Sequence, residues 1–129
     1  MSNGKEEMIM SKKILLVDDE LDMLKITKLR LEKSGYKIVT ATNGEEALGW
    51  LQTSIPDLIL LDLILPKIQG EEVCLQIKSN NRLKHIPIIV FTAKGEQIAK
   101  EAQRFCADDH ILKPFKPEEL LFKIKKLIG

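Results

Sequence analysis

The stretch Leu58-Ile59-Leu60-Leu61-Asp62 is a run of large aliphatic residues that ends abruptly in a carboxylate. It shows no alternation of polar and apolar residues, and Pro56 lies just before it. Such a short continuous apolar run is typical of a strand that is buried on both faces, as in the parallel sheets of α/β proteins. Lys13-Ile14-Leu15-Leu16-Val17, followed by Asp18-Asp19-Glu20, has the same form. The sequence therefore predicts a parallel sheet whose buried strands end in polar residues.

Three further strands and five helices complete the expected pattern. Residues 36–40 alternate between polar and apolar side chains, as an outer strand does, residues 86–91 are predicted as a buried strand that ends at Thr92, and residues 111–112 as a brief fifth strand. Apolar residues at helical spacing predict helices over 20–34, after Asn43, over about 71–80, around Ile98 to Phe105, and from Pro117. In the fourth of these helices the expected buried stripe is Ile98, Ala99, Ala102 and Phe105. Strands that alternate with helices predict an α/β fold with helices on both faces of the sheet.

The composition is that of an ordinary single domain. The chain has 129 residues, 44% of them hydrophobic and 30% charged, which is enough to bury a core without disulfides or a structural metal. A net charge of +1 gives no overall field that would attract nucleic acid or an anionic membrane, so we expect neither as a direct partner. No segment has the pattern of a signal peptide or a membrane span. We expect a cytoplasmic protein with a polar N-terminal extension over residues 1–11 and one domain over residues 12–129.

The two cysteines, Cys74 and Cys106, lack the spacing of metal ligands. Both fall on the apolar stripes of predicted helices or at their ends. We therefore interpret them as two separate small core residues in a reducing compartment.

The polar residues at the strand ends are the candidate functional residues. Asp18 and Asp19, Asp62, Thr92 and Lys113 each lie at the carboxyl end of a predicted strand. In a parallel sheet these ends point to one edge, where open α/β proteins bind ligands. Taken singly, each residue has an ordinary interpretation as a helix cap or a solvated loop residue. Their common placement at one edge instead predicts a functional crevice.

The chemistry that such a group suits is Mg²⁺-dependent phosphoryl transfer to Asp62. Carboxylates packed together repel one another unless they are protonated or a cation neutralises them. Oxygen ligands with room for water favour Mg²⁺, and a carboxylate beside that ion can attack phosphorus as a nucleophile. Lys113 would offset charge on the phosphoryl oxygens, and the Thr92 hydroxyl would hydrogen-bond to one of them.

Four segments together resemble the signature of response-regulator receiver domains. They are Val17-Asp18-Asp19-Glu20, Asp62-Leu63-Ile64-Leu65-Pro66, Thr92-Ala93 and Lys113-Pro114-Phe115. Their order and spacing match the family over about residues 12–128. The resemblance implies the flavodoxin-like strand order 2-1-3-4-5. It also implies that a sensor histidine kinase or a histidine phosphotransfer protein phosphorylates Asp62.

The same resemblance implies a role for each site residue. Four groups would bind Mg²⁺: the side chains of Asp18, Asp19 and Asp62 and the backbone carbonyl of Ile64. Thr92 and Lys113 would engage the phosphoryl group. Phosphorylation would change the surface formed by the fourth helix, the fifth strand and the fifth helix, which the family uses for output partners and dimers. The domain would be a signalling switch that promotes its own phosphorylation and dephosphorylation, and not an enzyme that acts on outside substrates.

The sequence departs from the family pattern at three notable positions. His110 stands three residues before the lysine, where the family usually has another aromatic switch residue. A histidine ring can still rotate, but histidine differs from tyrosine in polarity and in acid–base chemistry, which leaves a pH-sensitive switch and a histidine without a switching role as open alternatives. Cys106 stands where the family often has glycine, and Gln69 where it often has aspartate. Neither is expected to touch the chemistry.

Ile64 and Lys94 are expected to flank the path of the water that hydrolyses the phosphoryl group. Ile64 offers no hydrogen bond to this water and obstructs its approach, while Lys94 could hold phosphoryl oxygens without supplying a base. We therefore expect slow hydrolysis. The alternative is that Ile64 only packs on its loop and that the rate is set elsewhere.

Two other functions fit the same fold class. A flavodoxin-like cofactor binder would need a loop of Ser, Thr or Gly after the first strand to hold phosphate, and Asp-Asp-Glu would repel it. An aspartyl-phosphate hydrolase would need a general acid two residues after its nucleophile, where this chain has Ile64.

Overall fold

Strands and helices alternate along residues 11–129, which are the residues that the computed structural model describes. The extension predicted over residues 1–11 lies, apart from Ser11, outside the described residues. In chain order the elements are β1 (Lys13–Val17), α2 (Leu21–Lys33), β2 (Lys37–Ala41), α3 (Gly44–Leu51), β3 (Leu58–Asp62), α4 (Gly70–Lys78), β4 (Ile88–Thr92), α5 (Glu96–Phe105), β5 (Asp109–Leu112) and α6 (Pro117–Ile128).

The sheet is parallel throughout, with the strand order β2-β1-β3-β4-β5. This confirms the flavodoxin-like order that the family resemblance implied. β3 is the central strand, and every one of its residues is buried. Because helices cover both faces of β3, its apolar residues need not alternate with polar ones. β2 lies at an edge and is only partly buried over most of its length, as its alternating sequence predicted.

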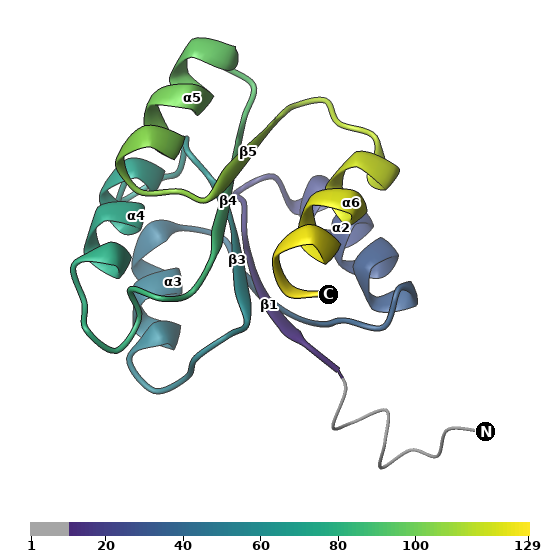
Figure 1. Ribbon diagram of the computed structural model, residues 1–129, viewed down its shortest axis with the longest axis horizontal. Helices are drawn as coiled ribbons and strands as arrows, with labels where there is room; N and C mark the ends of the chain where they lie inside the picture. The colour runs from purple at the N-terminus through teal and green to yellow at the C-terminus, as the bar shows by residue number, and fades with distance from the viewer. Residues whose placement is uncertain (1–10) are drawn as a thin grey trace.

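Two layers of helices enclose the sheet (Figure 1). α2 and α6 cover one face, and α3, α4 and α5 cover the other. Successive side chains of a strand point to opposite faces, so β1 contributes to both cores. Ile14 and Leu16 pack with buried residues of α2 and α6, whereas Leu15 and Val17 pack with those of α3 and α4.

A capping box starts α3, the helix that the sequence predicts after Asn43. The Asn43 side chain accepts a hydrogen bond from the Glu46 N–H at 2.8 Å. The Glu46 carboxylate reaches back and accepts one from the Thr42 N–H at 3.1 Å. Two backbone donors at the helix start are satisfied in this way, which fixes where α3 leaves the sheet.

The structure corrects two expectations about the core. Phe105 was expected on the buried stripe of α5 but is 72% exposed, because the stripe continues from Ala99 and Ala102 to Cys106, which is 7% exposed. The cysteines were expected to be two separate thiols, yet Cys74 and Cys106 are paired as a disulfide with their Cα atoms 5.8 Å apart. No helix within residues 11–129 is long and apolar enough to cross a membrane.

Candidate functional site

The predicted site residues lie where the strand order of the sheet reverses, between β1 and β3. Asp18 directly follows β1, and Asp62 is the last residue of the neighbouring strand β3. The helices after these two strands leave toward opposite faces of the sheet (Figure 1). A crevice opens at such a point in an open α/β sheet. Lys113 reaches the same place from the end of β5.

One ammonium group holds three carboxylates at this edge. Lys113 Nζ donates to Asp62 Oδ2 at 2.9 Å, to Asp18 Oδ2 at 3.0 Å and to Glu20 Oε1 at 3.1 Å. The side chains of Lys113, Asp18 and Asp62 are only 7, 1 and 6% exposed, whereas that of Glu20 is 63% exposed. Lys113 Nζ also lies 5.0 Å from the centre of the Phe91 ring, whose face adds a weak cation–π attraction.

The backbone after each strand fixes the carboxylates in place. The Ile64 N–H donates to Asp62 Oδ1 at 3.0 Å, and the Glu20 N–H donates to Asp18 Oδ1 at 3.0 Å. Each carboxylate therefore keeps its other oxygen for Lys113. The start of α4 closes tightly on β3 at Gly70, where a Cβ would overlap the carbonyl oxygen of Asp62. The sequence thus positions Asp62 through a glycine that no larger residue can replace without moving this loop.

Burial and ion pairing act against each other on the two central groups. Burial raises the pKa of Asp62, and the hydrogen bonds from the Ile64 N–H and from Lys113 only partly offset this. Burial alone would lower the pKa of Lys113, but its bonds to Asp62, Asp18 and Glu20 outweigh that effect and raise it. Lys113 is therefore a permanent cation at neutral pH, and Asp62 is a carboxylate whose charge is costly to keep.

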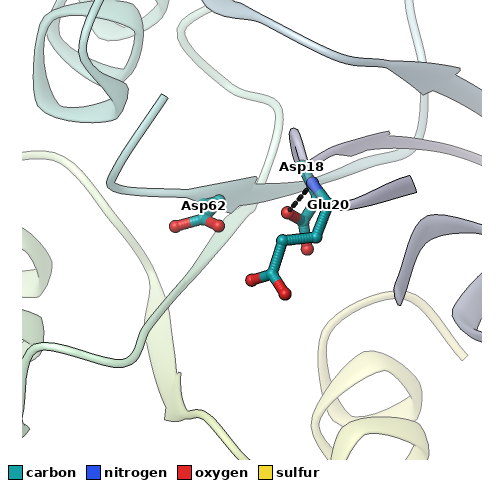
Figure 2. A group of neighbouring side chains, drawn as sticks. All are labelled: Asp18, Glu20 and Asp62. Carbon is teal, nitrogen blue, oxygen red and sulfur yellow. Dashed lines mark hydrogen bonds between the residues drawn. The ribbon is translucent and has the colours of Figure 1, made fainter. Parts of the chain in front are cut away.

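Among the acids, the carboxylate cluster contains Glu20 in place of Asp19, one of the predicted metal ligands. Asp18, Glu20 and Asp62 each place a carboxylate oxygen within 4.8 Å of the others. Figure 2 shows Asp62 beside Asp18 and Glu20, with the Glu20 backbone bonded to Asp18. Asp19 is exposed and is not in this group, although it lines the crevice. Sequence reasoning named Asp19 and passed over Glu20, whose only signal was its place in the Asp-Asp-Glu run.

A hollow of about 250 Å³ opens in front of Asp62. Its lining combines the acids and Lys113 with two small or apolar neighbours and consists of Asp19, Glu20, Asp62, Ile64, Ala93 and Lys113. Ile64 is 41% exposed and borders the hollow, as its predicted position beside the acceptor requires. The carboxylate oxygens of this donor set suit a hard metal ion such as Mg²⁺. Its one ammonium group suits the anionic oxygens of a phosphoryl group.

Thr92 and His110 lie on the strands next to the crevice. Thr92 ends β4, is fully buried, and accepts a hydrogen bond from the Lys94 N–H at 3.0 Å through its hydroxyl. His110 is half-buried in β5, and its Nδ1 donates to the side-chain oxygen of Gln103 on α5. The structure therefore brings Asp18, Asp62 and Lys113 into direct contact, while the side chains of Thr92 and His110, in β4 and β5, hydrogen-bond to Lys94 and Gln103.

Comparison with known proteins gives one consistent family. The family model described as response regulator receiver domain matches residues 14–125. The chain is 43% identical over 120 residues to the alkaline phosphatase synthesis transcriptional regulatory protein PhoP of Bacillus subtilis, covering 92% of this chain and 49% of that protein. The chain thus spans about half the length of the curated relatives it matches.

Solved structures agree with the sequence relatives. A putative response regulator from Chloroflexus aurantiacus superposes with a TM-score of 0.87 at 34% identity, covering 92% of this chain and 98% of that one. The receiver domain of the sensor histidine kinase PA1611 from Pseudomonas aeruginosa PAO1 superposes with a TM-score of 0.85 at 28% identity, covering 92% and 98%. The latter structure has a magnesium ion coordinated in its active site cleft.

Proposed function

Because the chain belongs to the response-regulator receiver-domain family of two-component signalling, we propose that it works as a switch in which Asp62 accepts a phosphoryl group. The observation that carries this proposal is the position of the Asp62 carboxylate. It faces a hollow, lies 2.9 Å from the Lys113 ammonium, and has two further carboxylates close by. We also propose that the domain spans residues 12–129.

The proposed step needs little beyond positioning and charge. An oxygen of Asp62 attacks the phosphorus of a phosphohistidine, a P–O bond forms, the P–N bond breaks, and the imidazole leaves and takes up a proton. Lys113 already touches the attacking carboxylate, so its ammonium moves a short way to a phosphoryl oxygen and offsets its charge. The Thr92 hydroxyl would donate to another oxygen after releasing the Lys94 N–H.

Mg²⁺ fits the donor set in front of Asp62. Asp18, Asp62 and the backbone carbonyl of Ile64 would hold it, with Asp19 or Glu20 reaching it directly or through water. When bound, the ion would neutralise the carboxylates and the transferring group. Lys113 provides this neutralisation for the carboxylates in the structure itself, which is why three acids can lie together.

The donor and the output partner are proposed from the family. A sensor histidine kinase or a histidine phosphotransfer protein would supply the phosphoryl group. The output partner, or a second receiver domain, would bind the surface of α5, β5 and α6, which are the fourth helix, fifth strand and fifth helix of the described chain. Relatives named as transcriptional regulators support a cytoplasmic location. The domain itself would contact neither nucleic acid nor membrane.

Phosphorylation of the acceptor can be measured directly. Acetyl phosphate with Mg²⁺ should add one phosphoryl mass that is lost in base, and Asp62→Asn should abolish it. Asp57→Asn is the matched control, because Asp57 precedes the opposite end of the same strand, where it accepts the Lys13 N–H at 2.8 Å. Undiminished labelling of Asp62→Asn, or equal loss in both variants, would overturn the assignment.

The switch is proposed to run from Thr92 to His110. When Thr92 turns toward the phosphoryl group, the His110 ring can enter the space it leaves, but only after its bond to Gln103 breaks. Phosphorylation then needs a preference of only a few kcal/mol for the second state. NMR shifts on beryllofluoride binding should reach residues 93–115, and Gln103→Ala should enlarge the shifted population. Shifts confined to the immediate neighbours of Asp62 would show that no switch is transmitted.

The lifetime of the phosphoryl group is proposed to depend on Ile64. This side chain borders the hollow, where it obstructs an in-line water. Ile64→Asn should speed phosphate loss about tenfold, which corresponds to about 1.4 kcal/mol of barrier. Lys94→Ala tests the second predicted residue, which lies outside the lining of the hollow. Equal or slower loss in Ile64→Asn would show that Ile64 does not gate the water.

A further inference from the structure

We propose that Cys74 and Cys106 form a redox-modification site, a reversible disulfide that restrains the switch helix α5. Cys74 lies in the middle of α4, and Cys106 directly follows the last residue of α5. The two are 32 residues apart in the chain, but their Cα atoms are 5.8 Å apart, a separation common in protein disulfides. The crosslink therefore joins two neighbouring helices, α4 and α5.

The reduced form is also compatible with the fold. The Cys106 thiol can donate to the carbonyl oxygen of Ala102, 3.4 Å away. Both cysteines belong to an extensive apolar cluster that also includes Val73 and Ile77 of α4 and Ala102 of α5, so the core does not depend on the crosslink. In the reducing cytoplasm that we propose for this chain, disulfides are rare and those that form are usually transient. Both states should therefore be accessible, which a purely structural disulfide would not require.

The surface beside Cys106 gives a reagent access to the pair. A hollow of about 290 Å³ lies between α4 and α5 and is lined by Leu75, Ala102, Phe105 and Cys106, with Glu71 and Glu101 also bordering it. Cys106 is 7% exposed there, whereas Cys74 is fully buried behind it. Cys106 is therefore the sulfur that an outside thiol or disulfide meets first. The two carboxylates favour small uncharged reagents over anionic ones.

The redox step is thiol–disulfide exchange with a low-molecular-weight disulfide, written RSSR. The Cys106 thiolate attacks one sulfur of RSSR, an S–S bond breaks, and RSH leaves with a proton. The Cys74 thiolate then attacks the Cys106 sulfur of this mixed disulfide and releases a second RSH. Two electrons pass from the cysteine pair to RSSR, so the net products are one protein disulfide and two RSH.

The consequence for the switch rests on the proposed function. α5 is joined to β4 through Gly95, whose φ of +107° is readily adopted only by glycine, and it carries Gln103, the partner of His110. The disulfide fixes the opposite end of α5 to α4. Because the crosslink holds this end of α5 against α4, it should oppose any movement of α5 that phosphorylation requires. Linkage then requires that a phosphoryl mimic make the disulfide easier to reduce by the same factor.

The site is tested by counting thiols in the intact chain. The protein is equilibrated with 2-mercaptoethanol or with bis(2-hydroxyethyl) disulfide, trapped with an alkylating reagent and weighed by mass spectrometry. We expect two alkylated thiols in the first case and a monomer with none in the second. Cys106→Ala should give one alkylatable Cys74 under reducing conditions and no intramolecular crosslink. Two free thiols after oxidation, or only crosslinked dimers, would overturn the site.

The coupling is tested by titrating beryllofluoride with Mg²⁺ into the reduced and the oxidised wild type. We expect the oxidised form to bind about tenfold more weakly, a factor within the usual range of coupling between sites. Cys106→Ala should bind alike under both conditions. Equal affinities of the two wild-type forms would refute the coupling. Binding by neither form would refute the proposed function and the coupling with it, while the thiol count would still decide the redox site.

Discussion

Replacing Lys113 by methionine removes the one cation among three carboxylates. Lys113, Asp18 and Asp62 have side chains that are 7, 1 and 6% exposed, so the two aspartates would lose their partner while remaining buried. Removing one member of a buried ion pair costs roughly 3–5 kcal/mol. Water can enter on the side of Glu20, which is 63% exposed, so we expect the lower end, about 3 kcal/mol.

The direction in which the pKa of Lys113 is shifted decides at which pH this loss of stability should be measured. The pKa of Lys113 is raised in the folded state. Its contribution to stability is therefore complete below the ordinary lysine value of about 10.4 and is lost only as the pH rises through the higher folded value. At pH 7 the whole difference should appear in urea unfolding with EDTA present, followed by circular dichroism and by the fluorescence of Trp50.

A divalent cation should reverse most of the loss in Lys113→Met. Mg²⁺ at about one hundred times its dissociation constant stabilises the folded state by about 2.7 kcal/mol. The gain should be smaller in the wild type, where the ion competes with the Lys113 ammonium for the same oxygens. Lys100→Met is the matched control, since Lys100 pairs with Glu96 while both side chains are 59% exposed, and it should change stability by less than about 1 kcal/mol.

Two results would refute this reasoning. If Lys113→Met is as stable as Lys100→Met in EDTA, the carboxylates do not depend on the lysine. If Mg²⁺ stabilises Lys113→Met no more than the wild type, the ion does not take the place of the ammonium. Either outcome would remove the electrostatic basis for a metal site at this edge.

Three smaller predictions follow from local contacts. Asn43→Ala should cost about 1 kcal/mol in urea unfolding, because the Glu46 N–H loses its 2.8 Å acceptor. Gly70→Ala should cost roughly 1–3 kcal/mol in the same assay and shift the NMR signals around Asp62, because the new Cβ would lie 2.6 Å from the Leu63 Cα. Burial raises the pKa of Asp62, so the folded state holds this proton more tightly than the unfolded chain does. The stability of the wild type relative to Asp62→Asn should therefore fall as the pH rises above the ordinary aspartate value of about 4, and a stability difference that does not change with pH would contradict this.

The fold and the centre of the site could be predicted because they depend on local pattern. An unbroken aliphatic run has few structures open to it other than a buried strand, and the carboxyl ends of parallel strands meet at one edge. Asp18, Asp62 and Lys113 follow from these two facts, although Lys113 is 95 residues from Asp18. No side-chain detail was needed, since the backbone brings the three residues together.

The features that the sequence did not predict depend on the orientation of side chains around a turn or a helix, and on contacts between residues far apart in the chain. Asp19 stays a predicted metal ligand, whereas the contact between Glu20 and Lys113 was not anticipated, because it depends on how the turn after β1 orients two adjacent acids. Phe105 was misplaced because the buried stripe of α5 continues from Ala99 and Ala102 to Cys106, and the same helical spacing allowed either residue 105 or residue 106 as its next member. Cys74 and Cys106 belong to different helices on the same face of the sheet, and no spacing rule relates two cysteines across two helices and a strand.

The site and the proposed output surface are joined by consecutive short contacts. Lys113 touches Asp62 through its side chain, while its backbone N–H donates to the Thr92 carbonyl at 2.9 Å. His110 lies three residues earlier in the same stretch of chain and is bonded to Gln103 of α5. A change of charge on Asp62 therefore acts on Lys113, and any movement of Lys113 acts on β5. Coupling by such a route requires an element with two discrete arrangements. We infer that α5 is this element, because it carries the partner of His110 and the cysteine pair can fix one of its ends. If α5 had a single arrangement, phosphorylation would change the crevice and leave the outer surface as it is.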